Sequence, residues 1–421
     1  MRTVAIIAEY NPFHNGHLYQ INTVRKELNA DYCLSLMSGN FLQRGTPAMW
    51  DKYTRADMSL RGGIDLVFEL PVVYSTGSAM DFAMGAVSIL DKLNCIDYLC
   101  FGAETDDINL FEKLSLTIIN EPADYVAFLK EELSSGKSFP AARAYALSAY
   151  FDNTEINKLL AQPNNILALE YITALKKRKS DIKPYIVKRN SAMYHDKELN
   201  QTISSATAIR NAIDNNNSLT NIDLSIPASS YEIIKNHYEV DSPIINNDLT
   251  PFIQYEILNL KTSNINYDTT KAIYGINNEL YNKINNNTIC NTYEQFIDIF
   301  SSKNTTKATT TRALIHMLLD YKYSDHKLFI ENDYAFYANI LGFNRKSSAL
   351  LKKIKENSQI PIVTKRADFS YVISNYNNIS NEIAEKMHGF DLKATEIYKL
   401  MVFNKFNNVI PNDFTRQIVI L

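Results

Sequence analysis

Two histidines, His14 and His17, lie three residues apart just after the apolar run of residues 3–8, and Gly16 stands between them. Unpaired N–H groups at the N-terminus of a helix carry partial positive charge and bind anions. Imidazole N–H donors beside such a terminus would hold phosphate oxygens, and a glycine would let the phosphate approach the backbone. This pattern predicts a phosphate-binding loop suited to attack on an α-phosphate with pyrophosphate leaving, a reaction catalysed mainly by positioning and electrostatics.

Other chemistries fit these histidines less well. Two histidines at this spacing could ligate zinc, but no carboxylate or cysteine set with zinc spacing accompanies them. The sequence contains neither GxxxxGK[ST] nor GxGxxG, which argues against a P-loop and against a dinucleotide-binding fingerprint. The four cysteines have no CxxC spacing and are typical of buried thiols in a reducing compartment.

The segments around the histidines predict the elements that position them. Residues 3–8 are short, β-branched and continuously apolar, as expected of a buried strand, and a helix is expected from about residue 16 to 28. Further strands are expected in "DYCLSLMSGN", "GIDLVFELP", "CIDYLCFGAE" and residues 184–188, with a helix over 79–93. This alternation predicts an α/β fold with a parallel, doubly wound, Rossmann-like sheet. Ligands bind beyond the carboxyl ends of such strands, where Gly102 would let a nucleotide pack on the backbone.

Three further segments could bind anions at that edge. The loop after the second strand carries Arg44, Lys52 and Arg55, which we expect to face phosphate or an RNA backbone. The segment "QPNNIL" reads as a helix start in which one asparagine caps and the other amide stays available for a ligand. In "ISSATAIR", serines open a helix and Arg210 follows in its second turn, which suggests a second phosphate-binding helix start.

The C-terminal half differs in character from the first half. An asparagine-rich stretch suggests a domain boundary near residues 220–240, and helical patterns dominate beyond it, including "AFYANILGF", with one strand-like piece, "IPIVTK". Residues 176–189 hold seven basic residues against one acidic residue, and residues 344–355 hold five basic and no acidic residues. Each could be a solvated face or an RNA contact.

The composition limits the class of protein. No apolar stretch of about 18 residues is present, so we expect no membrane span, and the apolar run at the N-terminus is too short for a signal peptide. A net charge of −3 gives no general attraction to nucleic acid or to membranes. We expect a cytoplasmic protein, and the oligomeric state is open.

Seven segments in order resemble one family. They are "EYNPFHNGH", "MSGNFLQRG", "DLVFELP", "FGAE", "PNNIL", "YHD" and "LGFNRK". Together they resemble the bacterial tRNA(Met) cytidine acetate ligases, within the HxGH nucleotidyltransferase superfamily, and the resemblance spans almost the whole chain.

The resemblance implies a specific reaction. ATP and acetate would form acetyl-adenylate and pyrophosphate, and the acetyl group would pass to the exocyclic amine of the wobble cytidine in elongator tRNA(Met). Mg²⁺ is the expected counter-ion of ATP. Residues 1–230 would form the nucleotidyltransferase-like catalytic domain, and residues 231–421 a mainly helical tRNA-binding domain.

By position, the resemblance also implies the site residues. His14 and His17 would be catalytic, stabilising charge on the phosphates. Ser205 and Arg210 are further candidates for the same anion. The ATP-binding residues would be Ile7, Ala8, Glu9, Tyr10, Asn11, Pro12, Phe13, His14, Asn15, Gly16, His17, Leu18, Tyr19 and Gln20, completed by Gly102, Asn164 and Arg189.

The chain also departs from the family pattern. It has "RNSAMYHD" where the family has "RIGAGYHD", Ala103 where serine is usual, and Ala168 where glycine is usual. Met193 and Ala168 add bulk near the site that receives acetate or the RNA end. Two other functions stay open on the sequence alone: a small-molecule adenylyltransferase acting on a mononucleotide, and a non-catalytic factor that binds ATP and RNA.

Overall fold

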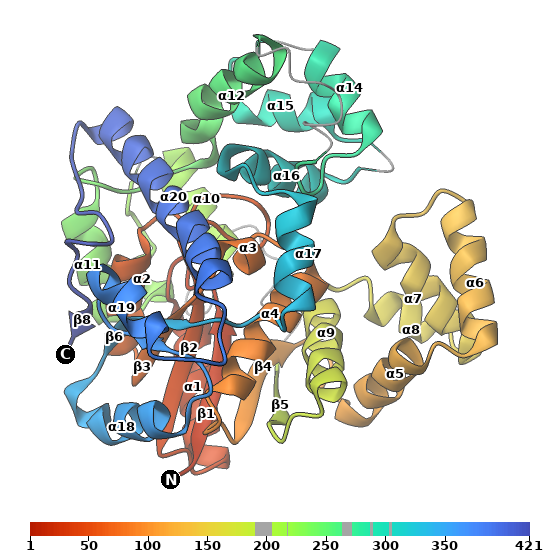
Figure 1. Ribbon diagram of the computed structural model, residues 1–421, viewed down its shortest axis with the longest axis horizontal. Coiled ribbons are helices and arrows are strands. Elements are labelled where there is room, and N and C mark those ends of the chain that lie inside the picture. Colours follow the sequence, from red (N-terminus) through yellow and green to blue (C-terminus); the bar gives the residue numbers. More distant parts are fainter. Residues whose placement is uncertain (190–203, 217, 263–271, 287–288, 303–304) are drawn as a thin grey trace.

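A single mixed sheet forms the centre of the computed structural model, which describes residues 1–189, 204–216, 218–262, 272–286, 289–302 and 305–421 (Figure 1). The strand order is β5-β4-β1-β2-β3-β6-β7, with β8 paired to β6. The strands β5, β4, β1, β2 and β3 are parallel, whereas β6 runs antiparallel to β3. The strands are β1 (Thr3–Ala8), β2 (Tyr32–Ser38), β3 (Leu66–Leu70), β4 (Tyr98–Ala103), β5 (Lys183–Lys188), β6 (Ala338–Phe343), β7 (Ile362–Val363) and β8 (Val419–Ile420).

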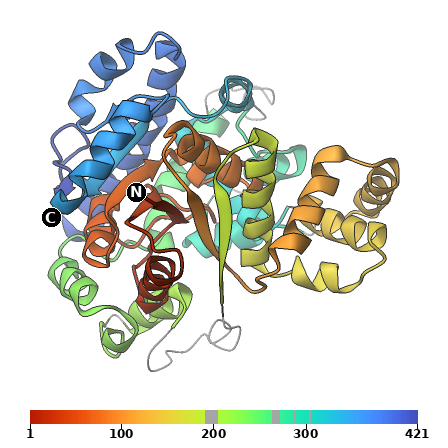
Figure 2. The ribbon, with the colours of Figure 1, turned by 90° about the horizontal axis from the view of Figure 1, so that it is seen from below.

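The central strands are buried on both faces, which explains their continuous apolar sequences. In β1, Val4 and Ile6 point into one apolar cluster, and Ala5 and Ile7 point into the other. Figure 2 shows helices on the two sides of the sheet. The first side holds α1 (Asn15–Glu27), α2 (Lys52–Arg61), α10 (Ala206–Asn216) and α11 (Ala228–His237). The second side holds α3 (Val72–Ser75), α4 (Ala79–Lys92), α9 (Pro163–Arg178), α18 (Ser348–Asn357), α19 (Phe369–Ser374) and α20 (Asn381–Phe406).

Two further groups of helices surround this core. A lobe beside the sheet follows β4 and returns to α9; it contains α5 (Ile108–Asn120), α6 (Ala123–Ser134), α7 (Phe139–Tyr150) and α8 (Glu155–Leu159) (Figure 1). The second group is α12 (Thr250–Thr262), α14 (Asn278–Asn286), α15 (Tyr293–Phe300), α16 (Lys307–Leu319) and α17 (Tyr323–Glu331). It meets the loop after β2, where the Thr311 hydroxyl donates to the Arg44 carbonyl oxygen. No helix in the described part of the chain is both long enough and apolar enough to cross a membrane.

The predicted α/β architecture is confirmed, and one element was wrong. The segment "AFYANILGF" was expected to be helical, but residues 338–343 form β6. A short apolar run fits a buried strand or a buried helix equally well, and only the open edge beside β3 decides between them. Because β6, β7 and β8 join the sheet of the N-terminal half, the sheet crosses the predicted boundary at residue 230; the division at that residue stays a prediction.

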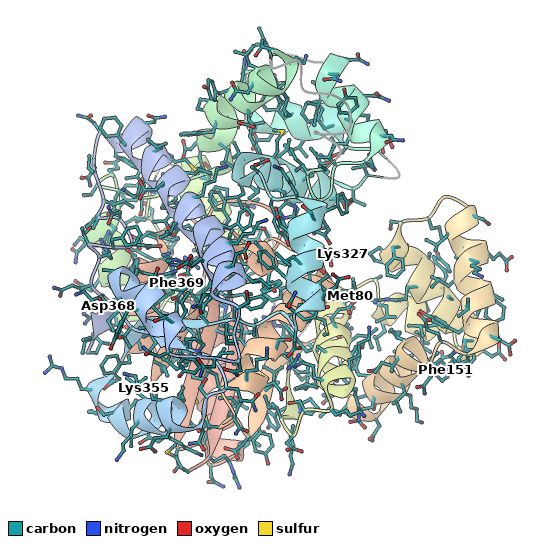
Figure 3. The ribbon with its side chains drawn as sticks, in the orientation of Figure 1. Met80, Phe151, Lys327, Lys355, Asp368 and Phe369 are labelled. Atoms are coloured by element: carbon teal, nitrogen blue, oxygen red, sulfur yellow. The ribbon has the colours of Figure 1, made fainter. Side chains whose placement is uncertain are left out.

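The C-terminal helices pack on the sheet through aromatic and ionic contacts. The ring of Phe369, on α19, points toward α20 and stacks on His388 with centroids 3.8 Å apart (Figure 3). At the same interface Lys52 is buried, and its Nζ donates to Asp413 Oδ2 at 2.7 Å and to Glu69 Oε1 at 3.0 Å. Arg366 also donates to Glu69. This buried ionic cluster joins the start of α2, strand β3 and the segment that follows α20.

Charge compensation keeps these groups ionised in the interior. Burial alone would lower the pKa of Lys52, but the carboxylates of Asp413 and Glu69 raise it overall. Burial alone would raise the pKa of Asp413, but Lys52 and Arg366 lower it overall. The expectation that Lys52 faces a phosphate or RNA is therefore wrong, because internal carboxylates already bind its ammonium group.

Replacing Lys52 with methionine should strongly destabilise the fold. Lys52→Met removes the close ion-pair partner of Asp413 and leaves Glu69 with Arg366 alone, and breaking a buried pair costs about 3–5 kcal/mol of unfolding free energy. Urea unfolding at pH 7 measures the difference. As a control, Lys158→Met removes a surface pair with Glu155 in which both side chains are over 70% exposed (73% and 71%), and it should leave stability unchanged. A loss below about 1 kcal/mol for Lys52→Met would contradict this account.

Candidate nucleotide-binding site

The two histidines build the start of α1 themselves. His14 is the N-cap residue, with extended backbone (φ −133°, ψ 174°), and its Nδ1 accepts a hydrogen bond from the Gly16 N–H at 3.0 Å. His17 Nδ1 accepts from the His14 N–H at 3.2 Å. This reciprocal pair is a capping box made of imidazoles. Since each Nδ1 accepts a proton donor, the neutral ring carries its own proton on Nε2.

Burial keeps both rings neutral. It lowers the pKa of His14 to about 3, with Arg189 and Arg210 adding to the shift. It also lowers the pKa of His17 well below its usual value, with His14 and Arg189 adding to it. The rings stack with centroids 3.8 Å apart. The site thus presents two neutral N–H donors, and the two arginines supply its positive charge.

Arg55 fixes the backbone beneath these histidines. Its buried guanidinium donates to the carbonyl oxygens of Trp50 at 2.9 Å, Ser38 at 3.0 Å and Glu9 at 2.5 Å, and also to that of Gly39. It therefore ties the carboxyl end of β1 to that of β2. The expectation that Arg55 faces a substrate was wrong, because backbone carbonyls at the strand ends bind the guanidinium.

Gly102 and Arg189 form the side of the site that faces β4 and β5. Gly102 on β4 lies opposite Val187 on β5, and the Arg189 N–H donates to the Ala103 carbonyl at 2.8 Å. A Cβ at position 102 would lie 2.5 Å from Arg189 Nε. Glycine is therefore required for the arginine side chain to lie across the strand, and both residues predicted from the sequence meet here.

The second predicted helix start also converges on this site. Ser205 Oγ accepts from the Ala208 N–H at 3.1 Å, so the predicted serine cap of α10 is confirmed. Arg210 donates from Nη1 to the Asn11 carbonyl at 2.8 Å, which places it beside the histidine loop. The Asn11 side chain in turn accepts from the Met49 N–H at 2.9 Å.

The asparagine pair works differently from the prediction. Neither side chain caps α9, which begins after Gln162 without a side-chain cap. Instead Asn165 Oδ1 accepts from the N–H groups of Glu104 and Thr105, at 3.0 and 3.2 Å. The Glu104 carboxylate accepts from Asn164 Nδ2 at 2.7 Å and from the Asn165 N–H at 2.9 Å. We call these four bonds the Glu104–Asn165 clasp; it closes the base of the α5–α8 lobe.

The remaining residues of the predicted ATP-binding stretch, residues 7–20, range from buried in the core to exposed. Tyr10 and Phe13 are buried and pack in the cluster that holds Val4, and Gln20 Nε2 donates to Cys100 Sγ at 3.3 Å. Tyr19 is 57% exposed. These residues shape or border the loop, and their assignment as ATP contacts stays a prediction. Residues 190–193, where the chain departs from the family pattern, lie outside the described residues.

The predicted basic run on α9 and β5 has internal partners. Arg178 donates to Asp91 at 3.1 Å and also pairs with Asp333, while Lys176 pairs with Glu112 at 2.8 Å. These pairs favour a solvated structural face over an RNA contact.

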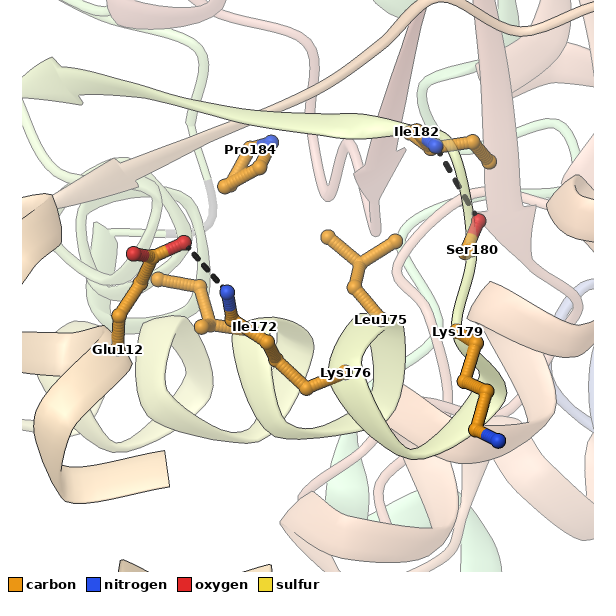
Figure 4. A pocket seen from close by; sticks show the side chains of 8 residues that line it. All are labelled: Glu112, Ile172, Leu175, Lys176, Lys179, Ser180, Ile182 and Pro184. Atoms are coloured by element: carbon orange, nitrogen blue, oxygen red, sulfur yellow. Dashed lines mark hydrogen bonds and ion pairs between the residues drawn. The ribbon is translucent and has the colours of Figure 1, made fainter. Parts of the chain in front are cut away.

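A small pocket lies beside this run, between α9 and the start of β5, lined by residues that include Leu175, Ser180 and Pro184 (Figure 4). It is at the amino end of β5, away from Arg189, and takes no part in the nucleotide site.

The comparisons with known proteins agree with this geometry. The sequence pattern of the family "HIGH Nucleotidyl Transferase" matches residues 1–411. A protein of Thermoanaerobacter sp. strain X514 named "tRNA(Met) cytidine acetate ligase" is 38% identical, with complete coverage of both chains. A protein of the same name from Acetivibrio thermocellus is 34% identical, again with complete coverage. The chain belongs to this nucleotidyl transferase family.

Solved structures of the family have the same fold over the whole chain. The crystal structure of Thermotoga maritima TmcAL bound with α-thio ATP has a TM-score of 0.90 and 30% identity. The apo form of that protein has a TM-score of 0.93 and 32% identity. Both cover all of this chain and all of their own.

Within this nucleotidyl transferase, the Nδ1 atoms of His14 and His17 accept backbone hydrogen bonds and are therefore not available to a metal ion. Among the described residues, no group of three or more His, Cys, Asp or Glu side chains is arranged to hold one. Sequence reasoning missed two side chains of this region, Arg55 as a positioning residue and Tyr171. The signal for Tyr171 was its spacing: it follows Asn164 by seven residues, two turns along the same side of α9.

Acid should destabilise the protein through these histidines. A lowered native pKa means that the unfolded chain binds more protons, so stability falls as the pH drops from about 6.5 toward 3, by about 1.4 kcal/mol per pH unit for each histidine. His14→Asn keeps an N-cap acceptor and removes this dependence. Urea unfolding at pH 7, 6 and 5 should therefore show a shallower slope in the variant.

His237 provides a control of opposite sign. Its pKa is raised, chiefly by the hydrogen bond with Asp241 at 2.9 Å, so its contribution is present at low pH and is lost as the pH rises through that pKa. His237→Asn should therefore steepen the loss of stability on acidification. An unchanged slope in His14→Asn would show that His14 is protonated in the folded protein.

Proposed function

We propose that this protein is an ATP-dependent ligase that activates acetate as acetyl-adenylate and transfers the acetyl group to the exocyclic amine of the wobble cytidine of elongator tRNA(Met). The observation that carries the proposal is the imidazole capping box at the carboxyl edge of the sheet, flanked by Arg189 and Arg210. Full-length similarity to relatives named for this activity supports the choice of substrates.

The site suits adenylation in the first half-reaction. The acetate carboxylate attacks the α-phosphate, the bond to the bridging oxygen breaks, and pyrophosphate leaves with the electron pair. Nε2–H donors of His14 and His17, the start of α1 and the two arginines would hold the phosphate oxygens as charge shifts toward pyrophosphate. Donors fixed before the reaction lower the barrier without reorganisation, which is the role that the capping box supports.

The proposal includes Mg²⁺ as the counter-ion of the ATP phosphates. No group of three or more His, Cys, Asp or Glu side chains among the described residues is arranged to hold a metal ion, which fits an ion held mainly by phosphates and water. We also propose a cytoplasmic location, where tRNA is available and where the four buried free thiols stay reduced.

The C-terminal region, with the exposed basic residues of α18, would contact the tRNA.

A small-molecule adenylyltransferase is the alternative with related chemistry. It would use the same phosphate site but would give no role to the helices that follow β5. Labelled acetate, ATP and total tRNA distinguish the two: the ligase transfers label to a cytidine and releases pyrophosphate. Transfer of AMP to a mononucleotide, with no label in RNA, would overturn the proposal.

Replacing His17 should abolish adenylate formation. His17→Asn keeps an acceptor for the His14 N–H but lacks the imidazole Nε2–H, so we expect pyrophosphate release to fall about hundredfold or more with an unchanged melting temperature. Near-normal pyrophosphate release in a folded variant would remove the role given to His17.

Replacing Gly102 should weaken ATP binding. In Gly102→Ala the new methyl group meets the Arg189 side chain at 2.5 Å and displaces it. We expect the Kd for ATP to rise about tenfold, equivalent to about 1.4 kcal/mol, as measured by calorimetry. Gly389→Ala is the control, since no atom lies within 4 Å of a Cβ at that position. Equal affinities in the two variants would contradict the role of Arg189 in ATP binding.

A further inference from the structure

Glu9 presents an oriented carboxylate at the centre of the carboxyl edge. It directly follows β1, and its carbonyl oxygen accepts from Arg55. Its Oε1 accepts from the Gln43 N–H at 2.9 Å, while Oε2 has no hydrogen-bond partner within the described part of the chain. The side chain is half-buried. Backbone and side chain are thus both held, with one carboxylate oxygen open to a ligand.

The surroundings of Glu9 place it beside the phosphate site. Tyr171 of α9 packs against Phe101 with ring centroids 5.2 Å apart, and its hydroxyl interacts electrostatically with both Glu9 and Arg189. Arg189 in turn acts on His14 and His17. On the other side, the Gln43 side chain donates to the Gly77 carbonyl at 3.3 Å, which ties the loop after β2 to the turn before α4. Glu9 therefore lies at the start of the histidine loop, against the loop after β2, and Tyr171 senses the charge of both Glu9 and Arg189.

The histidines cannot supply a base for the second half-reaction. Each Nδ1 accepts a backbone N–H, so each Nε2 holds the ring proton and can donate but cannot accept. An attacking amine must nevertheless lose a proton when it becomes an amide. An ionised carboxylate within reach of the acyl group is suited to accept it.

We infer that Glu9 is the general base of acyl transfer, an inference that rests on the proposed function. The nitrogen lone pair attacks the acetyl carbonyl carbon and forms the C–N bond. The bond from that carbon to the AMP oxygen breaks, and AMP leaves with the electron pair. One proton of the attacking amine passes to Oε2 of Glu9 and returns to solvent after product release.

The test separates the two half-reactions in Glu9→Gln. The glutamine carbonyl can still accept from the Gln43 N–H, so the loop keeps its hydrogen bond. Acetyl-adenylate formation from ATP and acetate, trapped by hydroxylamine as the hydroxamate, is measured first and is the reference for any change in ATP binding. Acetyl transfer to tRNA, measured in single-turnover reactions, should fall about hundredfold more than adenylate formation. The control is Glu112→Gln, which removes a carboxylate that pairs with Lys176 and should change neither step.

Several outcomes would overturn the inference. If both half-reactions fall together, Glu9 serves nucleotide binding and not proton transfer, and if neither falls it has no catalytic role. Glu9→Asp, which keeps a carboxylate, should transfer faster than Glu9→Gln at equal adenylate formation; equal transfer rates would exclude the base even if Glu9→Gln is less stable. Failure of the wild-type protein to acetylate tRNA would overturn the proposed function itself, and this inference with it.

Discussion

The hydrogen bonds with which His14 and His17 cap α1 are the constraint on which the site depends. Helix starts usually satisfy their first N–H groups with an oxygen of serine, threonine, asparagine or aspartate. An imidazole has two nitrogens, so it can cap the helix with one and keep the other for a ligand. Because capping also fixes the tautomer, the start of α1 and the two Nε2–H donors are set by the same hydrogen bonds.

That placement is achieved by polar contacts between strand ends. Arg55 donates to carbonyl oxygens at the ends of β1 and β2. In the Glu104–Asn165 clasp, Asn165 on α9 accepts from the N–H groups of Glu104 and Thr105, which directly follow β4. Carbonyl and N–H groups at the end of a buried strand have no ladder partner and need one. Side chains that bind these unpaired backbone groups also hold the strand ends in place. Gly102 and Arg189 therefore have a fixed position relative to the histidines.

The elements around the histidines could be predicted well from the sequence, because β1 and α1 have a clear apolar pattern and clear start and stop residues. It failed where a residue's role depends on distant partners. Lys52 reads as a surface cation until Asp413 and Glu69 are beside it, and β6 reads as helical until β3 offers an edge. One asparagine of the pair was expected to cap its own helix, yet Asn165 binds the backbone of Glu104, 61 residues earlier. Such pairings follow from topology and leave no local pattern.

The buried ionic cluster has a consequence for how the protein is made. Lys52 emerges from the ribosome 361 residues before Asp413. Until that segment arrives, Lys52 lacks Asp413, the carboxylate that makes its shortest contact, at 2.7 Å. The N-terminal half of the chain, which carries the nucleotide site, therefore cannot complete its buried ionic cluster until nearly all of the chain has been translated. Truncation before Asp413 would leave the residues of the nucleotide site in the chain but remove the closest partner of Lys52.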